Sequence, residues 1–392
     1  MAITDPIFIH SLFRAAGSYL LQKFRSLGPE FTCYQEPFSE SLMALNDPAR
    51  EDRLLQSAPC PLSRPARPDQ PPLHEFWVRR QQLRGLFRAS FCYRQYFFGG
   101  HLPRQQLAYL SALIEHAHGR PVLQFHRSSG RVQALQRHYG GVHLHVWREP
   151  RVQWWSYRST RYFDDVSRRV YCSDHLPEAL RRIAAMAGFG ADPLRPLGPR
   201  ENYLMFYGLW LDAWLRLRSH AELSISLDDI SASRRENLEC SRQLGELTGC
   251  AISLADAAAR GMAFASEEEG FYAELEHAVG DIFIRTGRGT ARSVEAAEEA
   301  ARNARRAHEL SSHDRFVERN LRQAALTMMQ ERVEDERSRE RRSTKMLAAR
   351  LWNSWRSRTQ AGKAARRHPG VTDDAAALAS SVDASIGTDR AR

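Results

Sequence analysis

Cysteine is scarce and scattered in this sequence. Six cysteines occur among 392 residues, and none of them forms a CxxC pair. This spacing argues against a zinc cluster and against a redox-active dithiol. Nor is the chain a short, cysteine-dense scaffold of the kind that disulfides stabilise outside the cell. We therefore expect reduced thiols, no metal centre and a cytoplasmic protein.

Long apolar runs are absent as well. No stretch of about 18 uninterrupted apolar residues occurs, so the sequence predicts no membrane-spanning helix. The first 21 residues lack a basic start, and Asp5, His10 and Arg14 interrupt them. We therefore expect no targeting segment there.

Apolar residues and positive charge, by contrast, are plentiful. The chain is 43% hydrophobic, enough to bury a substantial core as one large domain or as one domain with an appendage. The formal net charge is +10. Such a balance suits an anionic partner, which could be a nucleotide, a phosphorylated glycan, a nucleic acid or a membrane surface. Composition alone does not distinguish among these partners.

Short apolar strands alternate with helical segments between residues 5 and 260. This order predicts an α/β fold: a P-loop-like parallel sheet flanked by helices, with a helical C-terminal extension. Ligands of such sheets bind at the carboxyl ends of the strands. The predicted strands cover residues 6–10, 121–125, 142–147 and 223–227, and the main predicted helices cover 18–27, 107–118, 130–139, 203–217 and 236–248.

Composition changes at two places along the chain. Residues 45–73 are rich in proline and charge, which indicates an exposed loop within an insertion at about 40–100. After residue 265 the chain becomes rich in Ala, Arg and Glu at helical spacing. We expect a main domain over 1–265, a helical extension over 266–360 and a disordered tail over 361–392.

A loop between the first strand and the first helix has the features of a phosphate-binding turn. Gly17 allows the backbone to approach an anion closely, and the helix that begins near Ser18 directs its positive end to the same place. Arg14 adds a positive charge. The loop has one glycine and no Lys-Ser/Thr pair, so it is no P-loop of the GxxxxGK[ST] type. An ordinary strand-turn-helix unit would look similar.

A second motif follows the predicted strand at 142–147. Arg148 comes directly after this strand, Pro150 follows, and Ser156 lies eight positions beyond the arginine. An arginine at a strand end can bind a phosphate through paired hydrogen bonds, and a serine near a helix start can add another. A surface arginine and a capping serine are the simpler interpretation of the same residues.

Together the two motifs resemble those of the sulfotransferase superfamily that uses 3′-phosphoadenosine 5′-phosphosulfate (PAPS). The family's first strand ends in an R/K-x-x-G-T/S loop, and a later strand runs into R-x-P with a serine eight residues after the arginine. The resemblance implies transfer of a sulfuryl group to an acceptor hydroxyl, with adenosine 3′,5′-bisphosphate as product and no metal. The implied nucleotide-binding residues are Arg14, Ala15, Ala16, Gly17, Ser18, Tyr19, Arg148 and Ser156.

Glu36, followed by Pro37, completes the resemblance. Carbohydrate and protein-tyrosine sulfotransferases often have a catalytic base about two dozen residues after the loop, and Glu36 is similar to it. The resemblance thus implies Glu36 and Arg14 as catalytic residues, and it favours a glycan acceptor, with a tyrosine or a small phenol as alternatives. A carboxylate could accept the acceptor's proton. Glu36 could also be an exposed loop residue, and His126 is a second candidate for the base.

The resemblance covers residues 5–255. It includes some weaker matches, and the sequence differs from the family pattern at some positions. Arg127 and Arg131 match a stretch that is frequently basic in the family, and Trp214 with residues 223–230 resembles its W…(Y/L)-x-D-L segment. The C-terminal R-K-G motif is absent, and residues 285–289 only faintly resemble it. Tyr19 stands where a second Ser/Thr is usual, which leaves one phosphate contact in doubt.

Other residues allow competing interpretations. His143 and His145 share one face of a strand, but no nearby acid or cysteine completes a metal site, so we favour a structural role. Trp154, Trp155 and Phe206 could stack on adenine, although most such aromatics form core. A P-loop-type kinase remains an alternative function.

The last third of the chain suggests a further alternative, a non-enzymatic binding protein. Residues 341–367 contain many Arg and Lys and no acid, with tryptophan and leucine at helical spacing. Such a helix could bind an anionic membrane surface or an acidic partner, or it could pack on the α/β domain. We expect no nucleic-acid partner.

Overall fold

The computed structural model describes residues 5–56, 71, 73–98, 100–158, 161–189, 197–258 and 266–311, together with residues 327 and 330. The chain divides into two compact units, residues 1–320 and 321–392. The account below concerns the first unit. The basic segment at 341–367 and the tail at 361–392 lie outside the described residues, so their expected membrane docking and disorder stay predictions.

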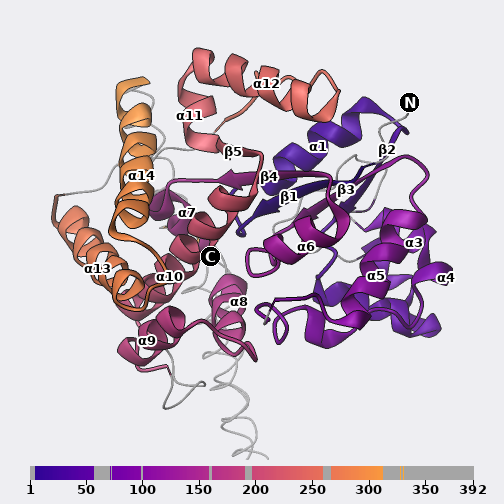
Figure 1. The fold of residues 1–392 in the computed structure, drawn as a ribbon, viewed down its shortest axis with the longest axis horizontal. Coiled ribbons are helices and arrows are strands. Elements are labelled where there is room, and N and C mark those ends of the chain that lie inside the picture. The colour runs from indigo at the N-terminus through magenta and orange to yellow at the C-terminus, as the bar shows by residue number, and fades with distance from the viewer. Residues whose placement is uncertain are drawn as a thin grey trace, which may run out of the picture. The chain divides into compact units, whose positions relative to one another are not determined.

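A sheet of five parallel strands forms the centre of the first unit (Figure 1). The expected α/β fold with a parallel sheet flanked by helices is confirmed. The sheet order is β2-β3-β1-β4-β5. The strands are β1 (Ile7–Ser11), β2 (Phe31–Gln35), β3 (Arg120–Phe125), β4 (Val142–Trp147) and β5 (Leu223–Ser226).

Helices connect the strands. The 3-10 helices are η1 (Glu40–Asn46), η2 (Pro48–Arg50) and η3 (Ala89–Phe91). The α-helices of the described residues are α1 (Gly17–Leu27), α2 (Arg53–Gln56), α3 (His74–Val78), α4 (Arg80–Leu83), α5 (Arg104–Glu115), α6 (Val132–Tyr139), α7 (Pro150–Tyr157), α8 (Arg161–Tyr171), α9 (Glu178–Met186), α10 (Pro199–His220), α11 (Leu227–Ala232), α12 (Arg234–Thr248), α13 (Ser266–Arg285) and α14 (Ala291–Ser311).

The two faces of the sheet are covered by different helices. Successive side chains of a strand point to opposite faces. Ile7 and Ile9 of β1 accordingly pack with α1, α11 and α12, whereas Phe8 packs in the larger cluster that contains α6 and α10. Both faces of the sheet are therefore buried, as is usual for parallel sheets. Figure 1 shows α1 and α6 on opposite sides of the strands.

The described parts of the insertion at about 40–100 pack against the core. Leu45, Leu54 and Leu73, all within the segment expected to be exposed, are fully buried in the larger cluster. At these three positions the expectation of an exposed loop is wrong. Residues 57–70 and 72 of this segment lie outside the described residues.

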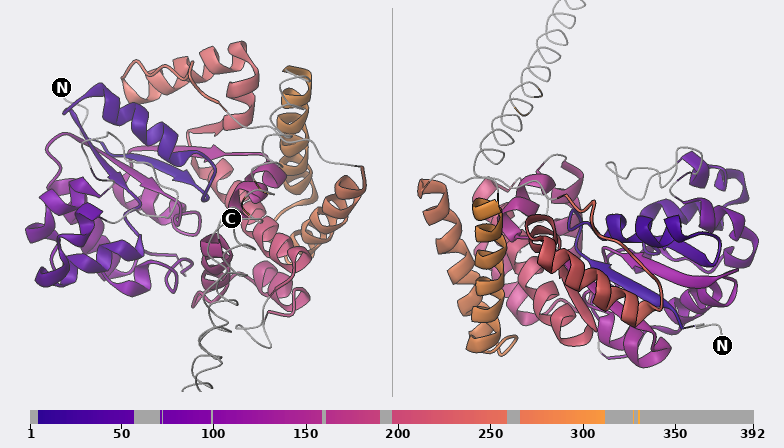
Figure 2. Two further views of the ribbon diagram at one scale, coloured as in Figure 1. Left: turned by 180° about the vertical axis from the view of Figure 1, so that it is seen from behind. Right: turned by 90° about the horizontal axis from the view of Figure 1, so that it is seen from above.

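Helices α13 and α14 belong to the same compact unit as the sheet. The expected domain boundary at residue 265 stays a prediction. Phe283 of α13 and Ala297 of α14 are fully buried in the larger cluster. Arg288, between the two helices, binds Asp212 of α10 at 2.6 Å. The two helices lie side by side (Figure 2).

Candidate functional site

The direction of the strand connections reverses between β1 and β4. From β1 the chain runs through α1 to β2, which lies beyond β3. From β4 it runs to β5, on the opposite side. Ligands of open α/β sheets bind in the crevice outside the carboxyl ends of strands at such a reversal. Arg14 follows β1 and Arg148 follows β4, so both predicted motifs lie at this point.

The loop after β1 has a constrained backbone. Arg14 and Ala16 have φ angles of 68° and 70°, a left-handed conformation that costs roughly 1–2 kcal/mol for an L-residue with a side chain. Gly17 is required by close packing: a Cβ there would come too close to Ser11 Oγ and would lie 2.9 Å from Gln124 Nε2. The loop ends at the N-terminus of α1, where backbone N–H groups have no acceptor within the helix. These groups and the helix dipole favour an anion.

The structure brings Arg14 and Ser156 together. Arg14 Nε donates a hydrogen bond of 2.7 Å to Ser156 Oγ, across 142 positions of the sequence. Arg148, which we expected to act with Ser156, lies beside Asp228 instead, with 3.5 Å between its Nε and Asp228 Oδ1. The serine of the second motif therefore joins the two motifs, while Arg148 is a largely buried neighbour of a carboxylate.

The other predicted residues of this loop are either buried in the core or hydrogen-bonded to another segment. Ala15 is buried, and Ser18 Oγ accepts a hydrogen bond from Gln35 Nε2 at 3.4 Å. The Tyr19 hydroxyl, at the position where the family usually has a second Ser/Thr, donates to Asp256 Oδ1 at 2.7 Å. Tyr19 thus links α1 to the segment after α12.

Glu36 is fully buried at the carboxyl end of β2. One of its carboxylate oxygens accepts from the backbone N–H of His126, and the other pairs with Arg127 Nη1. Burial raises the pKa of Glu36, against the opposing effects of Arg127 and the His126 N–H. Its backbone is left-handed, with a φ of 53°. The alternative of an exposed loop glutamate is therefore wrong, and the role of Glu36 as a base stays a prediction.

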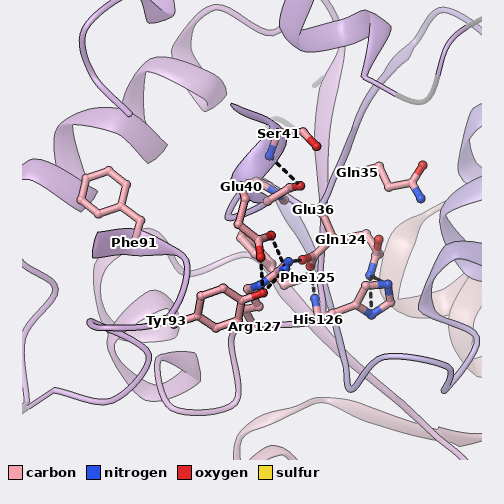
Figure 3. A network of polar contacts seen from close by, with 12 residues as sticks. Gln35, Glu36, Glu40, Ser41, Phe91, Tyr93, Gln124, Phe125, His126 and Arg127 are labelled. Carbon is pink, nitrogen blue, oxygen red and sulfur yellow. Dashed lines mark hydrogen bonds and ion pairs between the residues drawn. The ribbon is translucent and has the colours of Figure 1, made fainter. Parts of the chain in front are cut away.

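Arg127 is the centre of a buried polar network (Figure 3). Besides Glu36, its guanidinium binds Glu40 at 2.6 Å, the Tyr93 hydroxyl at 2.9 Å and the Tyr162 hydroxyl at 3.1 Å. It also lies over the ring of Phe13, 4.7 Å from the centroid, in the loop that contains Arg14. The network therefore adjoins the anion-binding loop.

His126 lies between the loop and this network. Its Nδ1 is 3.0 Å from Ser11 Oγ, and its ring is 4.7 Å from that of Phe13. Burial, and then the charge of Arg127, lowers the pKa of His126 to about 3. The imidazole is therefore neutral at pH 7, and its low pKa makes it a weak proton acceptor.

The other histidines of the sheet have structural partners. His143 Nδ1 is 2.9 Å from His10 Nε2, and His145 Nδ1 is 3.0 Å from Ser224 Oγ. Within the described ranges, no three His, Cys, Asp or Glu side chains are grouped so as to hold a metal ion. These contacts agree with the structural role that we favoured for His143 and His145.

Two of the aromatic candidates belong to the core, and the arginines of the C-terminal motif pair with acidic side chains. Trp154 and Phe206 pack against each other in the core, with ring centroids 5.4 Å apart. In the segment that faintly resembles R-K-G, Arg285 is exposed and pairs with Asp281, whereas Arg288 binds Asp212. Neither arginine is part of the site in this structure.

Several residues of the site were missed by the sequence analysis. Ser11 and Gln124 line the space beside Gly17, and Glu40, Tyr93 and Tyr162 bind Arg127. A signal existed only for Glu40, four residues after Glu36 on a turn that follows the same strand. Tyr93 and Tyr162 come from distant segments, and no local pattern marks them.

Comparisons provide no independent identification. Among the helices of the described residues, none is long and apolar enough to cross a membrane. Searches against protein-family models, curated proteins and solved structures found no match for this chain.

Proposed function

We propose that this protein is a sulfotransferase with a P-loop-like fold that moves a sulfuryl group from PAPS to an acceptor hydroxyl, with a glycan as the acceptor. One observation carries the proposal. Arg14 and Ser156, which come from the two motifs of the resemblance, meet in a hydrogen bond at the reversal point of the sheet. This contact supports the proposal because it places the two motifs close enough to contribute to one site.

The loop after β1 would bind the 5′-phosphosulfate. Arg14 and the first N–H groups of α1 can neutralise the charge that grows on the leaving phosphate as the bond between sulfur and the phosphate oxygen breaks. The close packing at Gly17 and the left-handed Ala16 hold these donors in place before a ligand arrives. Ser156 and Arg148 would bind the 3′-phosphate.

Glu36 would accept the acceptor's proton as the hydroxyl oxygen attacks sulfur. Burial raises the pKa of this carboxyl, against the opposing effect of Arg127, and a higher pKa makes the carboxylate a stronger base. For proton transfer, one of its two present hydrogen bonds must give way to the acceptor hydroxyl. His126, neutral and beside the loop, is the second candidate for this role.

Nucleotide binding is the first test. Adenosine 3′,5′-bisphosphate at about 100 times its Kd should stabilise the protein by about 2.7 kcal/mol, measured as a thermal shift, whereas ATP should have a much smaller effect. Preference for ATP would support a kinase instead. Absence of both shifts would leave a non-enzymatic binding protein.

Arg148 tests the assignment of the 3′-phosphate. Arg148→Ala should weaken the binding of adenosine 3′,5′-bisphosphate by about 2–4 kcal/mol, because a charge-assisted pair is lost. Arg158→Ala, at the exposed end of α7, serves as the matched control. Equal calorimetric affinities of the two variants would rule out this role for Arg148.

The base is tested with paired variants. Glu36→Gln should lower turnover by about 10²–10⁴ while nucleotide affinity is kept. His126→Gln should then retain most of the activity. The reverse result would assign the base to His126.

A further inference from the structure

Two carboxylates are buried beneath Arg148. Asp228 and Glu149 are both fully buried. Asp228 Oδ2 accepts the backbone N–H of Glu149 at 2.6 Å, and Asp228 Oδ1 lies 3.5 Å from Arg148 Nε. Two anions in the protein interior are tolerated only when cations and hydrogen bonds compensate them.

Glu149 connects the start of α7 to α14. Its Oε2 accepts the backbone N–H of Val152 at 2.7 Å and so caps α7. Its Oε1 accepts from Arg305 Nη2 at 2.7 Å and from Arg305 Nε at 3.1 Å. The Arg305 side chain is only 13% exposed, which preserves the strength of this pair.

The position of Glu149 controls both proposed ligands of the 3′-phosphate. Arg148 precedes it directly, and Ser156 lies about two helical turns into the helix that Glu149 caps. Without Arg305, Glu149 would remain as an uncompensated buried charge. It would then turn toward solvent or take up a proton, and either change weakens the cap.

We propose that Arg305 of α14 is a positioning residue for the 3′-phosphate site, acting through Glu149 on Arg148 and Ser156. The inference rests on the proposed function. It also gives α14 a role in nucleotide binding.

Loss of Arg305 should leave α14 in place. Val294, Ala297, Ala301 and Ala304 are buried along this helix. Arg288 separately anchors the turn before it to Asp212. A local effect on α7 can therefore be separated from loss of the fold.

The test compares adenosine 3′,5′-bisphosphate with adenosine 5′-phosphate, which lacks the 3′-phosphate. Arg305→Ala should weaken the bisphosphate about tenfold and change the monophosphate less than about twofold, measured by calorimetry. Arg302→Ala is the control, because Arg302 lies on the same helix, half exposed, and pairs only loosely with Glu298 at 3.8 Å. Equal bisphosphate affinities of the two variants, or equal losses for both nucleotides, would overturn the proposal.

A double variant should restore the affinity for the bisphosphate. Glu149→Gln combined with Arg305→Ala removes the unpaired charge and keeps an acceptor for Val152, so affinity should return to within about threefold of wild type. If Arg305→Ala fails to fold, Arg305→Lys decides: about fivefold weaker bisphosphate binding supports the proposal, and unchanged binding overturns it.

Amide hydrogen exchange separates this inference from the proposed function. Arg305→Ala should speed exchange of the Val152 amide at least about tenfold, whether or not the nucleotide binds. If wild type binds no bisphosphate, the proposed function fails. If it binds but neither readout responds to Arg305→Ala, the positioning role alone is wrong.

Discussion

The anion-binding loop and the Glu36–Arg127 network lie side by side but are built differently. Both follow strands of the sheet, and both contain a residue with positive φ, Arg14 and Glu36. Arg14 is only partly buried, at a helix N-terminus, whereas Glu36 and Arg127 are fully buried and bind each other. The loop contains an arginine that is partly exposed, whereas the ion pair of the network is fully buried. Loss of the loop arginine should therefore affect function with little change in stability, and loss of a charge in the network should affect stability strongly.

Of the variants considered, Arg127→Met should cause the largest loss of stability. It leaves Glu36 as a buried charge without its cation, which should reduce the free energy of unfolding by about 3–5 kcal/mol, measured by urea denaturation. Glu36→Gln added to Arg127→Met should recover part of the loss. If the single variant is as stable as wild type, the network is not what holds β2, β3 and the insertion together.

Arg14→Ala should give a similar effect on catalysis and little on stability. Loss of a group that stabilises the leaving phosphate should reduce kcat/KM by about 10²–10³, or about 2.7–4 kcal/mol. The free energy of unfolding should change by less than about 0.5 kcal/mol, because Arg14 is partly exposed. A large loss of stability with normal activity would show that Arg14 has a structural role and no catalytic one.

His126, between the two regions, should make stability depend on pH. The pKa of His126 is lowered to about 3 in the folded protein, against about 6.5 unfolded, so only the unfolded state gains a proton between these values. The contribution of the neutral imidazole to the free energy of unfolding is therefore present above pH 6.5. It is lost as pH falls, by about 1.4 kcal/mol at pH 5.5. His126→Gln should lose that much less stability than wild type between pH 7.5 and pH 5.5. Parallel pH profiles of the two proteins would show that His126 is protonated in the fold.

Of the variants considered, Ala16→Gly should have the smallest overall effect, and its change in stability should be a gain. Relief of the left-handed conformation at Ala16 outweighs the added freedom of the unfolded chain, so stability should rise by about 0.5 kcal/mol. Ala185→Gly, at an exposed helical position of α9, should instead cost about 1 kcal/mol. Thermal unfolding of both variants tests this contrast, and destabilisation by Ala16→Gly would mean that the loop is not strained.

The sequence predicted elements well where one pattern dominates a segment. The predicted strand at 142–147 coincides with β4, and the predicted helix at 236–248 ends at the same residue as α12, before Gly249 with a φ of 72°. β2 was not predicted as a strand, because five residues with two polar members carry little periodic signal. Arg127 and Glu40 were not expected to pair, since they are 87 positions apart and no local rule joins them.

Local chemistry in the sequence determined the alternation of strands and helices, the tight turn at Gly17 and the start of a helix directly after that turn. These follow from side-chain period and from the backbone freedom of glycine, which act within a few residues. Tertiary structure alone decided that Ser156 meets Arg14, that Glu36 is buried against Arg127, and that α14 reaches Glu149 through Arg305. Such pairings depend on which strands are neighbours and on where distant helices pack, and strand order is set by the whole core.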